Sequence, residues 1–120
     1  MDTPAITVYS YAVWMVKEGK ENEFIQTWER FARWTQQYRR GVVYGRLLQD
    51  IKDSRRFVTW GPWEDLESLQ AWRETVEFQQ AFQRFNELCT EIHPLSLRSI
   101  TLIGTGMEQE SIPEQDISCL

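Results

Sequence analysis

The stretch Gly61–Trp72, GPWEDLESLQAW, decides how this chain folds, because it passes from a strand pattern to a helix pattern. We predict that the strand ends at Pro62, since proline has no N–H to donate to a sheet ladder. The two acids Glu64 and Asp65 suit the first turn of a helix. The apolar residues that follow recur every three positions, which predicts one apolar helix face: Leu66, Leu69 and Trp72.

The residues before this stretch predict three strands and one long helix. A β-branched and aromatic run, apolar at both parities, predicts a first strand over Ile6–Val16. Glu21–Tyr38 carries aromatic residues at helical spacing and predicts a helix. Val42–Gln49, interrupted by Gly45, and Arg55–Trp60 flank a polar turn, which predicts a β-hairpin.

The residues after the stretch predict a second helix and a last strand. A break is expected at Arg73–Thr75, and Val76–Ile92 then shows the clearest amphipathic pattern of the chain. Cys89 falls on the apolar stripe of that helix and is predicted to be buried. We expect Pro94 to close the helix and Leu95–Ile103 to form the fourth strand.

The element order β-α-β-β-α-β, with a split second helix, predicts an α+β domain of the ferredoxin-like class over residues 1–103. Residues 104–120 are expected to form a flexible or partner-draping tail. Helices cover one face of the four-stranded antiparallel sheet, but the other face is apolar as well, through Tyr9, Tyr11, Val13 and Met15. A symmetric homodimer that stacks two sheets, a dimeric α+β barrel, is the simplest way to cover that face.

The composition limits the range of partners. Six Trp, six Phe and four Tyr in 120 residues favour an interface or a pocket. The formal net charge of −5 argues against nucleic acid, which needs a basic surface. We expect no membrane association and a cytoplasmic location, since neither a membrane-length apolar run nor a secretory pattern stands out. The two cysteines, Cys89 and Cys119, show no metal-binding spacing.

The two tryptophans Trp63 and Trp72, nine residues apart and followed by Phe78 and Phe82, resemble the second half of the antibiotic biosynthesis monooxygenase family. The resemblance covers most of residues 6–103 and implies a dimeric α+β barrel that binds flat aromatic molecules between sheet and helices. In the quinone-forming members no metal and no flavin takes part, because the phenolic substrate itself reacts with oxygen. The resemblance therefore implies no cofactor and no metal site.

The haem-degrading members of this family differ from the chain at two defining positions. Their pattern has two Trp, matched by Trp63 and Trp72, and then an iron-ligating His ten residues later, where this chain has Phe82. Their strand-one Asn lies seven residues before a Gly, which leads back from Gly19 to Ala12. The resemblance thus argues against haem degradation by that site, and haem binding without the usual ligand is a separate alternative.

The resemblance implies a cofactor-independent monooxygenase-like protein acting on a small aromatic or polycyclic compound, with no catalytic residue assigned. The substrate-binding candidates are two sheet-wall residues, two helix-wall residues and two polar residues, in that order: Trp14, Trp60, Trp72, Phe82, Tyr44 and Arg46. The alternative is a non-catalytic ligand-binding or stress-related dimer. A ligand site predicts a cavity of a few hundred Å3, whereas aromatic side chains that fill the space predict a solid core.

The single histidine, His93, is a weaker candidate. Its unperturbed pKa suits a general base. However, it directly precedes Pro94 at the expected joint of helix and strand, where a cationic residue is favourable for structural reasons. We therefore favour a structural role for His93.

Overall fold

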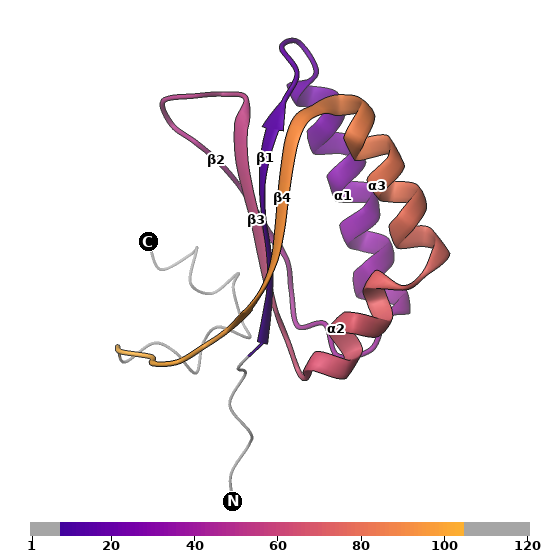
Figure 1. Ribbon diagram of the computed structural model, residues 1–120, viewed down its shortest axis with the longest axis vertical. Helices are drawn as coiled ribbons and strands as arrows, with labels where there is room; N and C mark the ends of the chain where they lie inside the picture. The colour runs from indigo at the N-terminus through magenta and orange to yellow at the C-terminus, as the bar shows by residue number, and fades with distance from the viewer. Residues whose placement is uncertain (1–7, 105–120) are drawn as a thin grey trace, which may run out of the picture.

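A computed structural model describes residues 8–104 as a four-stranded sheet with three helices on one side (Figure 1). The chain order is β1 (Val8–Val16), α1 (Glu21–Tyr38), β2 (Arg46–Gln49), β3 (Arg56–Trp63), α2 (Leu66–Arg73), α3 (Val76–Leu88) and β4 (Cys89–Arg98). All strand pairs are antiparallel and the strand order is β2-β3-β1-β4. This is the predicted ferredoxin-like α+β fold with its second helix split in two.

Alternation along β1 and β3 sorts the side chains between the two faces of the sheet. Trp14 pairs with Phe57 and Ala12 with Thr59, and these side chains are buried beneath the helices. The same core contains apolar residues of β1, α1, α3 and β4: Val16, Phe24, Phe85, Leu88 and Cys89. Trp14, Phe24 and Phe85 contact one another, and Phe57 contacts Phe24, so the helices and the sheet share one aromatic core.

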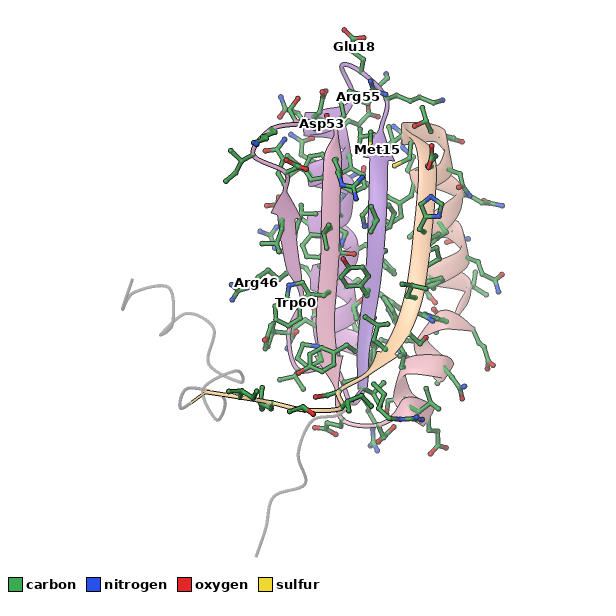
Figure 2. All side chains as sticks on the ribbon, turned by 60° about the vertical axis from the view of Figure 1, so that its left-hand side comes forward. Met15, Glu18, Arg46, Asp53, Arg55 and Trp60 are labelled. Carbon is green, nitrogen blue, oxygen red and sulfur yellow. The ribbon has the colours of Figure 1, made fainter. Side chains whose placement is uncertain are left out.

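The opposite face of the sheet, called the outer face below, carries no helix among the described residues (Figures 1 and 2). It includes residues from all four strands, with two charged side chains beside Met15: Tyr9, Tyr11, Val13, Met15, Arg46, Leu48, Arg56, Val58, Trp60, Glu91, His93, Leu95 and Leu97. Leu48, Leu95 and Leu97 are 45%, 50% and 41% exposed. The sheet is therefore apolar on both faces, as the first strand suggested.

The structure corrects the predicted end of β3, which runs through Pro62 to Trp63. The Pro62 carbonyl accepts a hydrogen bond from the Val43 N–H at 3.1 Å. In an antiparallel strand the N–H and C=O of one residue point toward the same neighbouring strand. The side of Pro62 on which other residues carry an N–H therefore faces the segment that contains Val43. That segment makes only an isolated bridge, Val42 to Trp63, and β2 begins at Arg46 rather than at Val42. A proline there interrupts no regular ladder.

The predicted boundary between the last helix and the last strand is also wrong. The helix α3 ends at Leu88, and Cys89 already belongs to β4, which ends at Arg98 rather than at Ile103. Pro94 lies inside β4, opposite Ala12 of β1. Because β4 is an edge strand, a residue without an N–H can be accommodated. Cys89 is buried as predicted, but it is a strand residue.

Side-chain caps start both α2 and α3, and the second lies at the predicted break between them. The Asp65 carboxylate accepts from the Ser68 N–H at 2.7 Å and starts α2. This hydrogen bond holds the pKa of Asp65 below its usual value. Thr75 starts α3: its hydroxyl oxygen accepts from the Phe78 N–H at 3.0 Å and donates to the Trp72 carbonyl at 2.8 Å. These caps place Trp72 and Phe78 in contact.

Some predictions fall at the ends of the chain. Ile6 and the tail over residues 105–120 lie outside the described residues. Just before that tail, the described segment 99–104 leaves the sheet and exposes Ile100 and Ile103 at 84% and 90% (Figure 1). None of the described helices has the length and apolar character needed to cross a bilayer.

Candidate functional site

A cavity of about 90 Å3 lies between the sheet and the three helices. Its walls are largely aromatic rings, with a few hydroxyl groups among them. The main lining residues come from β1, α1, β3, α2 and α3: Ser10, Ala12, Trp14, Trp28, Phe31, Thr35, Thr59, Trp63, Trp72, Phe78, Phe82 and Phe85. Such an apolar space with a few convergent polar groups is the usual form of a small-molecule site.

The rings that surround the cavity pack tightly on one another. Trp72 stacks on Phe31 with ring centroids 5.6 Å apart, and it also contacts Trp63 at 4.9 Å. On α3, Phe78 and Phe82 stack at 4.5 Å. This packing keeps the cavity volume below the roughly 300–1,000 Å3 of typical ligand pockets. The cavity is therefore smaller than the open pocket expected for a ligand site, but the core is not solid either.

Three of the five tryptophans that line the cavity donate their indole N–H to hydroxyl groups from other elements. Trp14 Nε1 donates to Thr59 Oγ1 at 3.0 Å, Trp63 Nε1 to Ser10 Oγ at 3.1 Å, and Trp72 Nε1 to Thr35 Oγ1 at 3.0 Å. The indoles therefore offer a ligand their faces, while their donors hold the walls together.

The three hydroxyl groups differ in where their own protons go. Thr35 Oγ1 donates to the Phe31 carbonyl at 2.9 Å, and Ser10 Oγ donates to the Gly61 carbonyl at 3.4 Å. The Thr59 hydroxyl accepts from Trp14, and within residues 8–104 it donates no hydrogen bond of its own. A hydroxyl has one donor and two acceptor sites. Thr59, only 8% exposed, therefore retains a hydrogen-bond donor at the cavity.

The structure brings three of the predicted site residues together at the cavity wall: Trp14, Trp72 and Phe82. Trp14 and Phe82 are in contact, with ring centroids 5.6 Å apart. Trp72 completes the helix side through its contacts with Phe31 and Phe78.

The other three predicted site residues gather toward the outer face. Trp60 and Tyr44 border the cavity, but their rings contact each other at 5.7 Å, and Trp60 also contacts the outer-face residue Tyr9. Trp60 lies opposite Tyr11, at the parity opposite to that of Trp14. Arg46 does not line the cavity: its guanidinium lies 5.9 Å from the Trp60 ring centroid (Figure 2).

Sequence reasoning missed the hydroxyl residues of the cavity. The sequence pattern that could have revealed them is a polar residue on the buried face of a strand. Ser10 lies on the same face of β1 as Trp14, and Thr59 lies on the same face of β3 as Phe57. A polar side chain that recurs on a buried strand face is the pattern to examine in such sheets.

His93 lies in the middle of β4, opposite Val13 on the outer face, so the expected position at a helix end is wrong. Its Nε2 lies 3.0 Å from a Glu91 carboxylate oxygen, and both side chains are exposed. Within residues 8–104, no three His, Cys, Asp or Glu side chains are grouped as a metal site.

A second, more polar hollow of about 480 Å3 lies where the end of α1 meets α2. Its lining is Tyr38, Arg39, Arg40, Glu67, Ser68 and Ala71. It contains one aromatic ring, and Tyr38 is 64% exposed. The aromatic cavity, rather than this hollow, matches the stacking surfaces expected from the sequence.

The comparisons with known proteins agree with this geometry. The profile of the family described as antibiotic biosynthesis monooxygenase matches residues 7–84. SnoaB, a cofactor-independent oxygenase from Streptomyces nogalater, is similar in structure with a TM-score of 0.75 at 18% identity, over 84% of this chain and 100% of SnoaB. No curated protein sequence matches the chain.

Two further solved structures show the same fold. A Nitrosomonas europaea protein that carries the same family name is similar with a TM-score of 0.72 at 15% identity, over 87% of this chain and 100% of that protein. PA3566 from Pseudomonas aeruginosa is similar with a TM-score of 0.68 at 20% identity, over 83% of this chain and 100% of that protein. At these identities the likeness establishes the fold, and the profile match over more than half of the sequence establishes the family. The chain belongs to the antibiotic biosynthesis monooxygenase family.

Proposed function

We propose that this protein is a cofactor-independent monooxygenase that oxidises a small phenolic aromatic compound in the cavity between sheet and helices. The observation that carries the proposal is the Thr59 hydroxyl, which accepts from Trp14 and keeps its own proton for a ligand. The aromatic faces of Trp14, Trp72 and Phe82 supply the stacking surface around it. The structural similarity to a cofactor-independent oxygenase supports the same reaction class.

The proposed reaction needs no electrons from outside the substrate. A phenol with a free ring position reacts with O2, one oxygen atom enters the ring as a carbonyl, the other leaves as water, and the product is a quinone. The substrate gives up four electrons and O2 accepts four. The protein contributes a water-poor cavity, orientation of the ring and a donor to the phenolic oxygen, which carries negative charge as it deprotonates.

The small volume of the cavity limits the substrate or requires movement of the walls. A cavity of about 150 Å3 is known to admit a single benzene ring, whereas the cavity here measures about 90 Å3. The stacked rings of Phe78 and Phe82 lie on one helix, α3, and each is only partly buried. We infer that these two rings turn outward when a ligand enters, and that one aromatic ring is the smallest substrate unit.

We propose further that the protein works as a homodimer joined through the outer face. The exposed leucines Leu48, Leu95 and Leu97 lie on that face beside aromatic residues, which is costly for a monomer in water. The exposed Ile100 and Ile103 extend the apolar surface beyond the sheet. We also propose that residues 1–103 form the domain and that residues 104–120 form a separate tail. In the dimer this tail would lie across the partner subunit.

The test is oxygen consumption and quinone formation with a panel of one- and two-ring phenols that have a free ring position, in metal-free and flavin-free buffer. We expect the wild type to exceed the spontaneous oxidation rate and Trp72→Ala to lose that excess, because Trp72 forms the stacking wall. Arg33→Gln, on the exposed surface of α1, is the control and should retain it. A wild-type rate equal to the spontaneous rate for every compound would overturn the proposal.

A non-catalytic ligand-binding or stress-related dimer is the second candidate, and the tight packing of the rings favours it. In that case aromatic compounds bind, or the cavity stays closed, and oxygen uptake never exceeds the spontaneous rate. A structure determined after soaking with phenols, read for an enlarged cavity and a bound ring, separates binding from a solid core.

A further inference from the structure

Arg73 is one of the residues that line the aromatic cavity. Arg73 is the last residue of α2 and directly follows Trp72, whose ring forms the cavity wall. Its side chain reaches across to the edge strand β4: Nη1 donates to the Ser96 hydroxyl, and Nη2 donates to the Leu95 carbonyl at 3.0 Å. The position of this charge is therefore fixed by both neighbouring elements.

Both of these partners are neutral. Among residues 8–104, no carboxylate forms an ion pair with Arg73, whereas Arg84, for example, pairs with Glu23 and Glu87. Arg73 is partly buried, and this desolvation lowers the pKa of its guanidinium. A guanidinium has five N–H donors, so two hydrogen bonds leave three of them unused. A partly desolvated cation with spare donors and no counter-charge is favourable for binding an anion.

We propose that Arg73 selects ligands that carry an acidic group, a carboxylate or an ionised phenol, on the aromatic ring that enters the cavity. The inference rests on the proposed function and adds the charge of the substrate to it. The ring would stack against Trp72 and Phe82, and the anionic group would remain at the cavity edge beside Arg73. The hydrogen bonds to Ser96 and Leu95 orient the guanidinium in advance, so little side-chain entropy is lost on binding.

The chemical alternative is that Arg73 only fastens α2 to β4. Such a role needs the two hydrogen bonds that are present, and it makes no distinction between charged and neutral ligands. A pair of ligands equal in shape and different in charge separates the two roles. Benzoate and benzamide form such a pair, and each has the single ring that the cavity can accept with the least rearrangement.

The experiment measures the binding of benzoate and of benzamide to the full chain through the indole N–H signals of 15N-labelled protein. Trp14, Trp63 and Trp72 report directly on the cavity, since each lines it. We expect the wild type to bind benzoate about ten-fold more tightly than benzamide at low ionic strength, the scale of one charge-assisted hydrogen-bond pair. Arg73→Gln should bring the two affinities together by weakening benzoate alone, and Arg73→Lys should retain part of the preference.

Arg33→Gln is the matched control, because it removes the same charge from an exposed helix position and should leave the preference unchanged. If Arg73→Gln does not fold, the salt dependence of the wild type carries the test: the affinity for benzoate falls between low and high salt, while that for benzamide does not. Equal affinities of the wild type for both compounds, or an equal loss of both in Arg73→Gln, overturn the inference and leave the proposed cavity intact. If neither compound moves the indole signals at millimolar concentration, the cavity itself is wrong.

Discussion

Trp14 and Thr59 join two neighbouring strands through one buried hydrogen bond, in which Trp14 Nε1 of β1 donates to Thr59 Oγ1 of β3 at 3.0 Å. Trp14 pairs with Phe57 and Ala12 pairs with Thr59, so the hydrogen bond joins diagonal neighbours on the two strands. Both residues are more than nine-tenths buried. The bond fixes the plane of the Trp14 ring at the cavity and sets which hydroxyl lone pair is occupied.

Thr59→Val should both destabilise the protein and remove the proposed donor. Valine has nearly the same shape, so the main loss is the acceptor of the buried Trp14 N–H, which costs about 1–3 kcal/mol. We expect a lower urea midpoint and loss of phenol oxidation for Thr59→Val. Thr59→Ser, which keeps the hydroxyl, should retain oxidation. If Thr59→Val oxidises phenols as fast as the wild type, the hydroxyl has no role in the reaction.

Val13→Arg should convert the proposed dimer into a monomer. Val13 lies on the outer face between Val58 and His93, and an interface there would bury an unpaired charge. Gln80→Arg adds the same charge to an exposed position of α3 and should leave the dimer intact. Light scattering after size exclusion gives both masses. A wild type that is monomeric at micromolar concentration removes the dimer from the proposal.

Thr75→Ala should loosen the joint of α2 and α3. The Thr75 hydroxyl both caps α3 at the Phe78 N–H and binds the Trp72 carbonyl, so its removal leaves both backbone groups without these bonds. Loss of such a cap costs about 1 kcal/mol of unfolding free energy. Thr75→Ser keeps both bonds and should cost much less. An unchanged denaturation curve for Thr75→Ala would show that the joint is held by ring packing alone.

Cys89 should make the protein less stable in alkaline solution. Burial raises the pKa of the Cys89 thiol from 9.0 to about 11, against a smaller opposing effect of Lys17. Below pH 9.0 the thiol is neutral in both states and the stability is full. As the pH rises from 9.0 toward 11, the unfolded thiol ionises first, which favours unfolding by at most about 2–3 kcal/mol.

Comparison of the wild type with Cys89→Ala isolates this effect from the other groups that titrate in the same range. We expect Cys89→Ala to be less stable at pH 8, because it leaves a small cavity, and to lose less free energy of unfolding between pH 9.0 and 11. Equal losses in the two proteins would mean that the Cys89 thiol is hydrated in the folded state.

Added haemin should remain unligated. Phe82 lies in the cavity wall, at the sequence position where the resemblance to the haem-degrading members implies an iron-ligating histidine. The single histidine, His93, lies on the outer face. We therefore expect no shift of the Soret band when protein is added to haemin. A shift that persists in His93→Ala would reveal haem binding through another group.

The local sequence determined the parts of this fold that depend on short-range pattern. The helix over Glu21–Tyr38 has the predicted ends, because its apolar stripe recurs with helical spacing and a glycine-containing turn precedes it. The break before Val76 was also predicted, since Thr75 can cap a helix and its neighbours cannot extend the stripe. The apolar residues at both parities of β1 predicted two apolar faces.

Tertiary structure decided the features that depend on strand pairing. The face on which Trp60 lies follows from its pairing with Tyr11, a residue 49 positions away, and a shift by one residue would have turned it inward beside Trp14. Cys89 and Ile92 are spaced as in a helix, yet pairing with β1 makes them strand residues. Pro62 and Pro94 were expected to end elements, but both sit where a missing donor interrupts no regular ladder. Local pattern cannot specify register, because the partner strand contributes half of each hydrogen bond and its own side chains decide which face is buried.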